Sequence, residues 1–212
     1  MKTILLTIAL LSSATLYAQR AKYDSSQELR GSGRLIRETK SVVSFTRIQT
    51  QQFPANTTVE VGGDESSVDI SLDDNLRPFL QIDEQNGVLK LSFAEPSGKP
   101  FWISKSTISV TIRTPRLIGF KHGSNSNVDI NGLNGERFDL ANQANGNVTL
   151  RGKVTTLNVV SAANGDVQAD DLIAQTANVV STANANLRIN AQTVNEVNSG
   201  NGQVINVAKR AK

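Results

Sequence analysis

The stretch that decides the fold is Asn145-Gly-Asn-Val148-Thr-Leu150, which reappears as Asn164-Gly-Asp-Val167-Gln-Ala169. Three further segments share its pattern of a polar turn followed by alternating apolar residues. They are Asn125-Ser-Asn-Val128, Asn184-Ala-Asn-Leu187 and Asn201-Gly-Gln-Val204. Successive shared apolar positions lie 20, 19, 20 and 17 residues apart. Self-similarity at a fixed period near 20 indicates a stack of repeated coils.

Each repeat is expected to open with a sharp corner and to continue as a short strand. Asn tolerates left-handed backbone and Gly adopts it freely, so we expect left-handed residues at these corners. In a segment such as Val128-Asp129-Ile130, alternate side chains point to opposite faces, which directs the apolar pair inward. Stacked coils about 4.8 Å apart would bury these apolar faces together. Counting backwards from Val128 extends the register to Ile108, Val88 and Val68.

A meander of β-hairpins is the alternative interpretation, because Asn-Gly is also a strong hairpin signal. A meander of short strands would place turns every 8–12 residues, whereas here they recur about every 20. This spacing favours the stack and leaves an antiparallel sandwich as the other candidate. The first half carries most of the aromatic residues and has loops at Pro78, Pro96 and Pro100. We therefore predict an all-β solenoid with coils of about 20 residues, wider and less regular in the N-terminal half.

The N-terminal segment has the pattern of an export signal. A basic start at Lys2 precedes an apolar run, and Leu16-Tyr-Ala18 fits a cleavage site before Gln19. We expect residues 1–18 to be a signal peptide and residues 19–36 to be a polar spacer, with a basic tail at 208–212. No later stretch has the length of a membrane-spanning helix. Because the chain has no Cys, we expect a periplasmic, outer-surface or secreted protein that is not a lipoprotein.

Composition disfavours several functional classes. The formal net charge is only +3, with no basic stripe interleaved with aromatics, so we expect no nucleic-acid partner. Zero cysteines and a single histidine disfavour the common zinc sites, and we predict neither a metal nor a cofactor. The single histidine, His122, is interpreted as a surface-loop residue. Asn164-Gly-Asp is an isolated match to a calcium-roll repeat, which does not predict a calcium site.

Carboxylates are the remaining route to catalysis. Asp129 and Asp166 would lie about two coils apart, near the separation used by inverting glycosidases. They fall in different columns of the predicted stack, however, and solvated strand faces also explain them. Asp73-Asp74, Asp69 and Asp170-Asp171 are weaker candidates. We therefore predict no catalytic residues.

The corner asparagines form the most regular polar column in the sequence. They are Asn125, Asn145, Asn164, Asn184 and Asn201. The column either presents a polar ladder to a glycan or partner surface, or supports the corners through hydrogen bonds. These five residues are the candidate ligand-binding residues, and the supporting role is the favoured interpretation.

The order of these features resembles the bacterial family of putative auto-transporter adhesin head domains, called the head GIN domain. The resemblance rests on the segment Arg37 to Ile48, on Val68-Asp-Ile70 with Asp74-Asn-Leu76, and on Ile108-Ser-Val-Thr-Ile112 before the Asn-Gly coils. It implies a right-handed β-helix-like solenoid over residues 37–207. The family name suggests adhesion, and the lack of a catalytic residue set leads us to expect a non-catalytic exported cell-envelope protein.

Three functions follow as expectations. The first is an adhesion or interaction module that binds an unknown envelope protein or glycan. The second is a polysaccharide-active or glycan-binding β-helix protein, and the third is a structural envelope component. The sequence leaves a homo-oligomer open.

Overall fold

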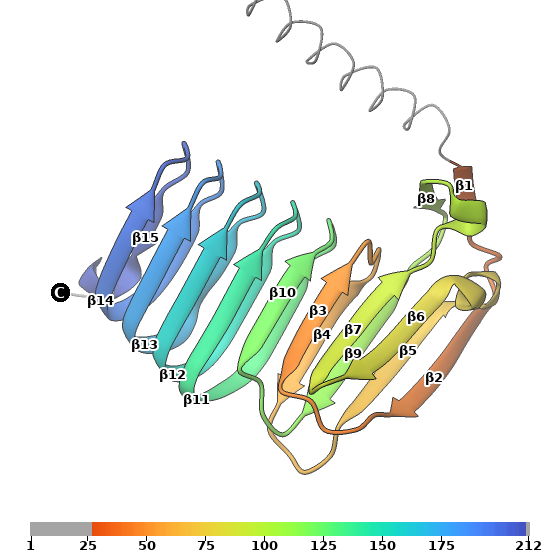
Figure 1. Cartoon of the computed structure of the whole chain (residues 1–212), viewed down its shortest axis with the longest axis horizontal. Coiled ribbons are helices and arrows are strands. Elements are labelled where there is room, and N and C mark those ends of the chain that lie inside the picture. Colours follow the sequence, from red (N-terminus) through yellow and green to blue (C-terminus); the bar gives the residue numbers. More distant parts are fainter. Residues whose placement is uncertain (1–26, 211–212) are drawn as a thin grey trace, which may run out of the picture.

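The computed structural model describes residues 27–210, which form an all-β fold around one strongly curled sheet (Figure 1). The predicted signal peptide lies outside the described residues, as do residues 211 and 212 of the basic tail. The first strands are β1 (Gln27–Arg30), β2 (Leu35–Ser41), β3 (Arg47–Gln51), β4 (Asn56–Val61), β5 (Ser67–Asp73), β6 (Leu80–Gln85), β7 (Val88–Phe93), β8 (Phe101–Ser104) and β9 (Ser109–Thr114). The later strands are β10 (Gly119–Gly123), β11 (Val128–Asn142), β12 (Val148–Ser161), β13 (Val167–Ser181), β14 (Leu187–Asn198) and β15 (Val204–Asn206). Short 3-10 helices span Asp74–Phe79, Pro96–Gly98 and Val207–Arg210.

Strands β10 to β15 pair only in parallel with one another, in the order in which they occur in the chain. Val128 pairs with Val148, and Val148 pairs with Val167. The next pairs are Val167 with Leu187 and Leu187 with Val204. These are the positions that the sequence pattern aligned. Parallel pairing excludes the antiparallel sandwich for this part of the chain.

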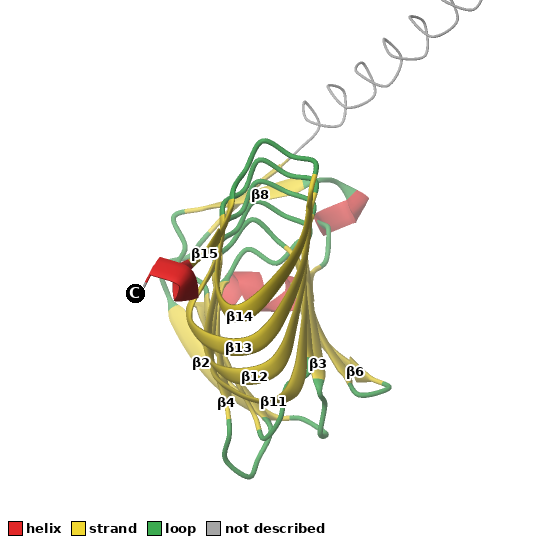
Figure 2. Cartoon of the chain, turned by 90° about the vertical axis from the view of Figure 1, so that its left-hand side faces the viewer, coloured by secondary structure: helices red, strands yellow, loops and turns green. Residues whose placement is uncertain are grey.

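Each long strand from β11 to β14 bends into a U, and a turn connects it to the next (Figure 2). Each turn with the strand that follows it is called a coil here. Bending requires local departures from regular pairing, and the register of β11 against β12 shifts between Ile130 and Leu133. Gly152 lies at the equivalent bend of β12 with φ of +135°. A Cβ at Gly152 would lie 2.1 Å from the Leu133 carbonyl oxygen, so this bend needs glycine.

The core lies inside the U and becomes narrower toward the C-terminus. Along one inward column, Phe138 is followed by Leu157 and then Ala177, and all three are fully buried. The N-terminal part holds larger side chains, including Phe53, which packs 6.1 Å from Phe93 between ring centroids. The decrease in side-chain volume explains why late coils need only small aliphatic residues.

The N-terminal part departs from chain order, and the backward extension of the register was wrong. Val128 stacks on Thr57 of β4, and Thr57 stacks on Val110 of β9. Val68 lies in β5, which runs antiparallel to β9. Val88 lies in β7, which pairs in parallel with β3. A period count assumes that each coil stacks on the one before it in sequence. Here β9 is inserted between β4 and β5, so the count fails.

Residues 27–36 are folded, although the sequence predicted a polar spacer there. β1 pairs in parallel with β8 as a separate two-stranded ribbon, and β2 pairs antiparallel with β5. The connection between β1 and β2 is held by the last residue of β5 and by the segment that follows it. The Gly33 N–H donates to Asp73 Oδ1 at 2.6 Å, and Asn75 Nδ2 donates to the Arg30 carbonyl at 2.8 Å.

Candidate functional site

The predicted asparagine column is present, and its members bond to one another from coil to coil. The Asn145 N–H donates to Asn125 Oδ1 at 3.3 Å, and the Asn164 N–H donates to Asn145 Oδ1 at the same distance. Further along, Asn184 Nδ2 donates to Asn164 Oδ1 and Asn201 Nδ2 donates to Asn184 Oδ1. Four of the five side-chain oxygens therefore accept hydrogen bonds inside the ladder.

A second ladder runs beside the first, two residues later in each turn. The Asn147 N–H donates to Asn127 Oδ1 at 3.0 Å, and the Asp166 N–H donates to Asn147 Oδ1 at 2.9 Å. Asn186 continues the series by donating its N–H to Asp166 Oδ1 at 2.8 Å. Turn backbones cannot pair through a regular strand ladder, so these side chains satisfy their N–H groups instead.

The turn position after each asparagine is restricted to small residues by close packing and not by backbone handedness, since Ser126 and Ala185 occupy it in two of the turns. Neither Asn145 nor Gly146 has a positive φ, and the same holds for the next turn, so the expectation of left-handed corners was wrong. A Cβ at Gly165 would lie 2.1 Å from the Gly146 carbonyl oxygen. Adjacent turns approach so closely that only glycine or a very small residue fits.

A buried polar column lies beneath the turns and was not predicted from the sequence. Its members occupy one register position in five neighbouring strands of the sheet, β3, β10, β11, β12 and β13, close to the end of each strand and just before a turn. They are Thr50, His122, Asn142, Ser161 and Ser181, all at most 2% exposed. The sequence does carry a signal for this column, because a polar residue recurs at the end of each apolar strand at the same register position.

His122 belongs to this column, so its interpretation as a surface-loop residue was wrong. The side chain has no exposed area, and its Nδ1 lies 3.2 Å from Thr50 Oγ1. A Cβ at Gly146 would lie 2.6 Å from His122 Nε2, so the imidazole fills space under the turn. Burial lowers the pKa of His122 from 6.5 to about 4. The ring is therefore neutral at physiological pH.

The carboxylates considered for catalysis are engaged in separate structural contacts. Asp129 lies on the outer face of β11, where its Oδ1 accepts from Arg151 Nη1 at 3.1 Å. Asp166 lies in a turn and accepts the Asn186 N–H described above. Within residues 27–210, no group of three or more His, Asp or Glu side chains is arranged to hold a metal ion.

A cleft of about 440 Å³ lies where the row of turns meets the β1–β8 ribbon. One wall is formed by residues 101–103 of β8 and by Pro100, which precedes the strand. The facing wall is formed by two turns, at residues 52–54 and 123–126. Glu95 also lines the cleft, which therefore brings together residues from segments that are far apart in the sequence. Of the five candidate asparagines, only Asn125 lines it.

The cleft offers both hydrogen-bond donors and acceptors at its rim. Gln52 Nε2 donates to Glu95 Oε1 at 3.4 Å, which leaves the second carboxylate oxygen of Glu95 as an acceptor. Ser126 Oγ donates to the Phe53 carbonyl at 3.1 Å. Asn125 uses its Oδ1 in the ladder, so its side-chain NH₂ is left to donate. Gln52 has φ of +47°, an uncommon backbone conformation for a residue other than glycine.

The apolar part of the cleft is anchored to the core. Phe101 and Ile103 are half-buried and pack against it, and the Phe101 ring lies 6.2 Å from that of Phe93. Because side chains alternate along a strand, Trp102 points to the other face of the ribbon, where it is 52% exposed. The sequence predicted a loop up to Pro100 and did not single out the strand that follows it.

The described residues contain no helix long and apolar enough to cross a membrane. No curated protein matches the chain in sequence. Among solved structures, a putative adhesin from Bacteroides fragilis is similar, with 19% identity and a TM-score of 0.64. The similarity covers 84% of this chain and all of that one. A protein from Parabacteroides distasonis described as a putative lipid binding protein gives 13% identity and a TM-score of 0.55, covering 82% of this chain and 98% of that one.

These likenesses concern the fold, because both sequence identities are low. Membership is shown by a family model, which matches residues 44–208. The match spans both the irregular N-terminal strands and the regular coils. The chain therefore belongs to the family described as putative auto-transporter adhesin, head GIN domain.

Proposed function

We propose that this protein is an exported cell-envelope protein that acts as a non-catalytic adhesion or interaction module. The observation that carries the proposal is the cleft between the β8 segment and the first turns, with its apolar floor and polar rim. Ligand sites are typically concave, with a few polar groups placed around an apolar surface. The family description and the export pattern of residues 1–18 support the same conclusion.

The asparagine ladder has a structural role in this proposal. Its oxygens accept hydrogen bonds from the next coil, so a ligand would have to compete with the turns themselves. Asn125 is the member proposed to contact a ligand, because it begins the ladder and lines the cleft. Asn145, Asn164, Asn184 and Asn201 are proposed to hold the turns in register.

The stacked coils are proposed to wind as a right-handed solenoid. Parallel strands joined by crossover connections are right-handed in nearly all known folds, which supports this winding. In this proposal the stacked coils act as a rigid support for the cleft.

The function is tested by a binding screen against glycans and purified envelope proteins, using protein purified from a host that exports it. A double variant, Gln52→Arg with Glu95→Lys, fills the rim and reverses its charge. We expect it to weaken binding of any ligand found by at least about tenfold, equivalent to 1.4 kcal/mol. Gln168→Lys on the distant outer face of β13 is the control and should bind normally. Equal binding by the double variant would refute the cleft as the site.

A further inference from the structure

One edge of β8 has no partner strand among the described residues. Its other edge pairs with β1, where the Gln27 N–H donates to the Pro100 carbonyl at 2.9 Å and the Gly31 N–H donates to the Ser104 carbonyl at 3.0 Å. In a parallel pair, alternate residues direct their backbone groups to opposite edges. The N–H and C=O groups of Phe101 and Ile103 therefore point to the unpaired edge.

This unpaired edge borders the cleft. Pro100 to Ile103 line it as consecutive residues, although alternate side chains of a strand lie on opposite faces. Consecutive lining of this kind is expected when the edge of a strand forms the wall. In Figure 1, β8 lies between β1 and the row of turns, so its unpaired edge faces those turns. The backbone groups of Phe101 and Ile103 thus open into the cleft.

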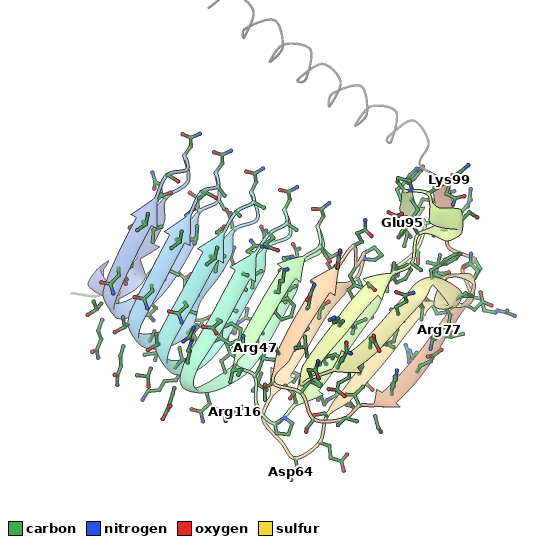
Figure 3. All side chains as sticks on the ribbon, viewed as in Figure 1. Arg47, Asp64, Arg77, Glu95, Lys99 and Arg116 are labelled. Carbon is green, nitrogen blue, oxygen red and sulfur yellow. The ribbon has the colours of Figure 1, made fainter. Side chains whose placement is uncertain are left out.

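The side chains around the cleft restrict what would fit. Phe101 and Ile103 provide half-buried apolar surface next to the edge, as does Pro54 on the opposite wall. Glu95 supplies the only ionised side chain among the lining residues and lies where β7 leads toward the ribbon (Figure 3). A single carboxylate favours a neutral or basic occupant over an acidic one.

We propose that the cleft binds an extended peptide segment of a partner protein, which adds to β8 as the third strand of the β1–β8 ribbon. This inference rests on the proposed interaction function and specifies its partner class. Unpaired N–H and C=O groups two residues apart match a peptide backbone, which is the recognition mode called β-augmentation. A saccharide has no such repeating pair, so the observations favour the peptide.

The first test selects random seven-residue peptides, displayed on phage, on the immobilised protein. We expect enriched sequences with few acidic residues. Ile103→Pro removes one free-edge N–H without removing a bond to β1, and should weaken the enriched peptides at least tenfold. Ile103→Val keeps the N–H and should bind within about threefold of the unchanged protein. Failure to enrich any peptide would overturn the proposal.

A second test does not depend on how well the proline variant folds. Hydrogen exchange of the unchanged protein should be fast at the Phe101 and Ile103 amides and slower at Trp102, whose N–H faces β1. Adding an enriched peptide should slow exchange at Phe101 and Ile103 and leave Trp102 unchanged. Peptide binding that leaves these two amides unaffected would refute strand addition.

The outcomes also separate this inference from the proposed function. A glycan that binds the unchanged protein, and is lost in the Gln52→Arg with Glu95→Lys variant, would support the cleft as an interaction site. If no peptide were enriched in the same study, the peptide assignment would be wrong while the proposed function stood. If neither a glycan nor a peptide bound at the cleft, the peptide assignment and the proposed function would both be overturned.

Discussion

Acidification should destabilise this protein through His122 before its carboxyl groups begin to titrate. The folded-state pKa of His122 is about 4, whereas an unperturbed histidine titrates near 6.5. The unfolded chain therefore binds a proton in this window and the folded chain does not. His122 accordingly contributes full stability above pH 6.5, and that contribution is lost as the pH falls toward 4.

The size of the effect follows from the pKa difference. Lowering the pKa from 6.5 to about 4 corresponds to roughly 3–4 kcal/mol over the whole window, at about 1.36 kcal/mol per pKa unit. Between pH 7.5 and pH 5 the expected loss is about 2 kcal/mol. Few other groups titrate there, because His122 is the only histidine in the chain and unperturbed carboxyl groups titrate near pH 4.

The assay is urea unfolding followed by circular dichroism at pH 7.5, 6.5, 5.5 and 5. His122→Asn is the matched variant, because Asn142 occupies the same column position in the next coil. We expect the unchanged protein to lose about 2 kcal/mol of unfolding free energy and the variant to lose less than about 0.5 kcal/mol. Equal pH dependence in the two proteins would refute the assignment of a buried neutral histidine.

Three other changes test the packing of the coils. Gly165→Ala should destabilise the fold by about 2 kcal/mol in urea unfolding, because its Cβ would overlap the Gly146 carbonyl of the preceding turn. Phe138→Ala should cost about 3–5 kcal/mol by the same measurement, because the residue is fully buried and its side chain is larger than those of Leu157 and Ala177 in the same column. Glu196→Val should promote association in sedimentation velocity. Glu196 pairs in register with the buried Val179 and lies on the part of β14 that has no further strand beside it among the described residues, so its charge disfavours further stacking there.

Each of these three changes has a control and a contrary result. Thr182→Ala alters an exposed turn position and should change the free energy of unfolding by less than about 0.5 kcal/mol. If Thr182→Ala and Gly165→Ala lost similar amounts of stability, tight packing of the turns would not explain the glycine. Phe138→Leu keeps most of the side-chain volume and should cost clearly less than alanine. Glu196→Gln removes the charge alone and should associate less than the valine variant. A strictly monomeric Glu196→Val protein would show that the charge does not limit stacking.

The local pattern of the coils could be predicted because it is repeated. Val148 and Val167 follow similar turns, so one physical reading applied to both, and their pairing in the structure follows from that shared pattern. The N-terminal strands carry no such repeat. The placement of β9 between β4 and β5 depends on long-range pairing, which a period count cannot detect. The burial of His122 was missed for a related reason, since its column neighbour Thr50 lies 72 residues away.

The residues of the candidate cleft also divide into those that could be predicted from the sequence and those that could not. Asn125 could be selected from the sequence because it belongs to a visible column. Gln52, Glu95 and the edge of β8 could not be, because they come from segments without a shared pattern that meet only in the folded chain. No motif marks a strand edge, since the groups that define it belong to the backbone.

The sequence by itself determined the all-β character, the period of the coils and the narrowing core, because alternation and repetition act between residues close in the chain. Only the tertiary structure decided why the turn glycines are needed, where the polar residues beneath the turns lie, and which strand is left with an open edge. These features depend on close approach between different coils and on pairing across long separations. Such contacts arise when the sheet curls and stacks, and no short stretch of sequence contains both partners.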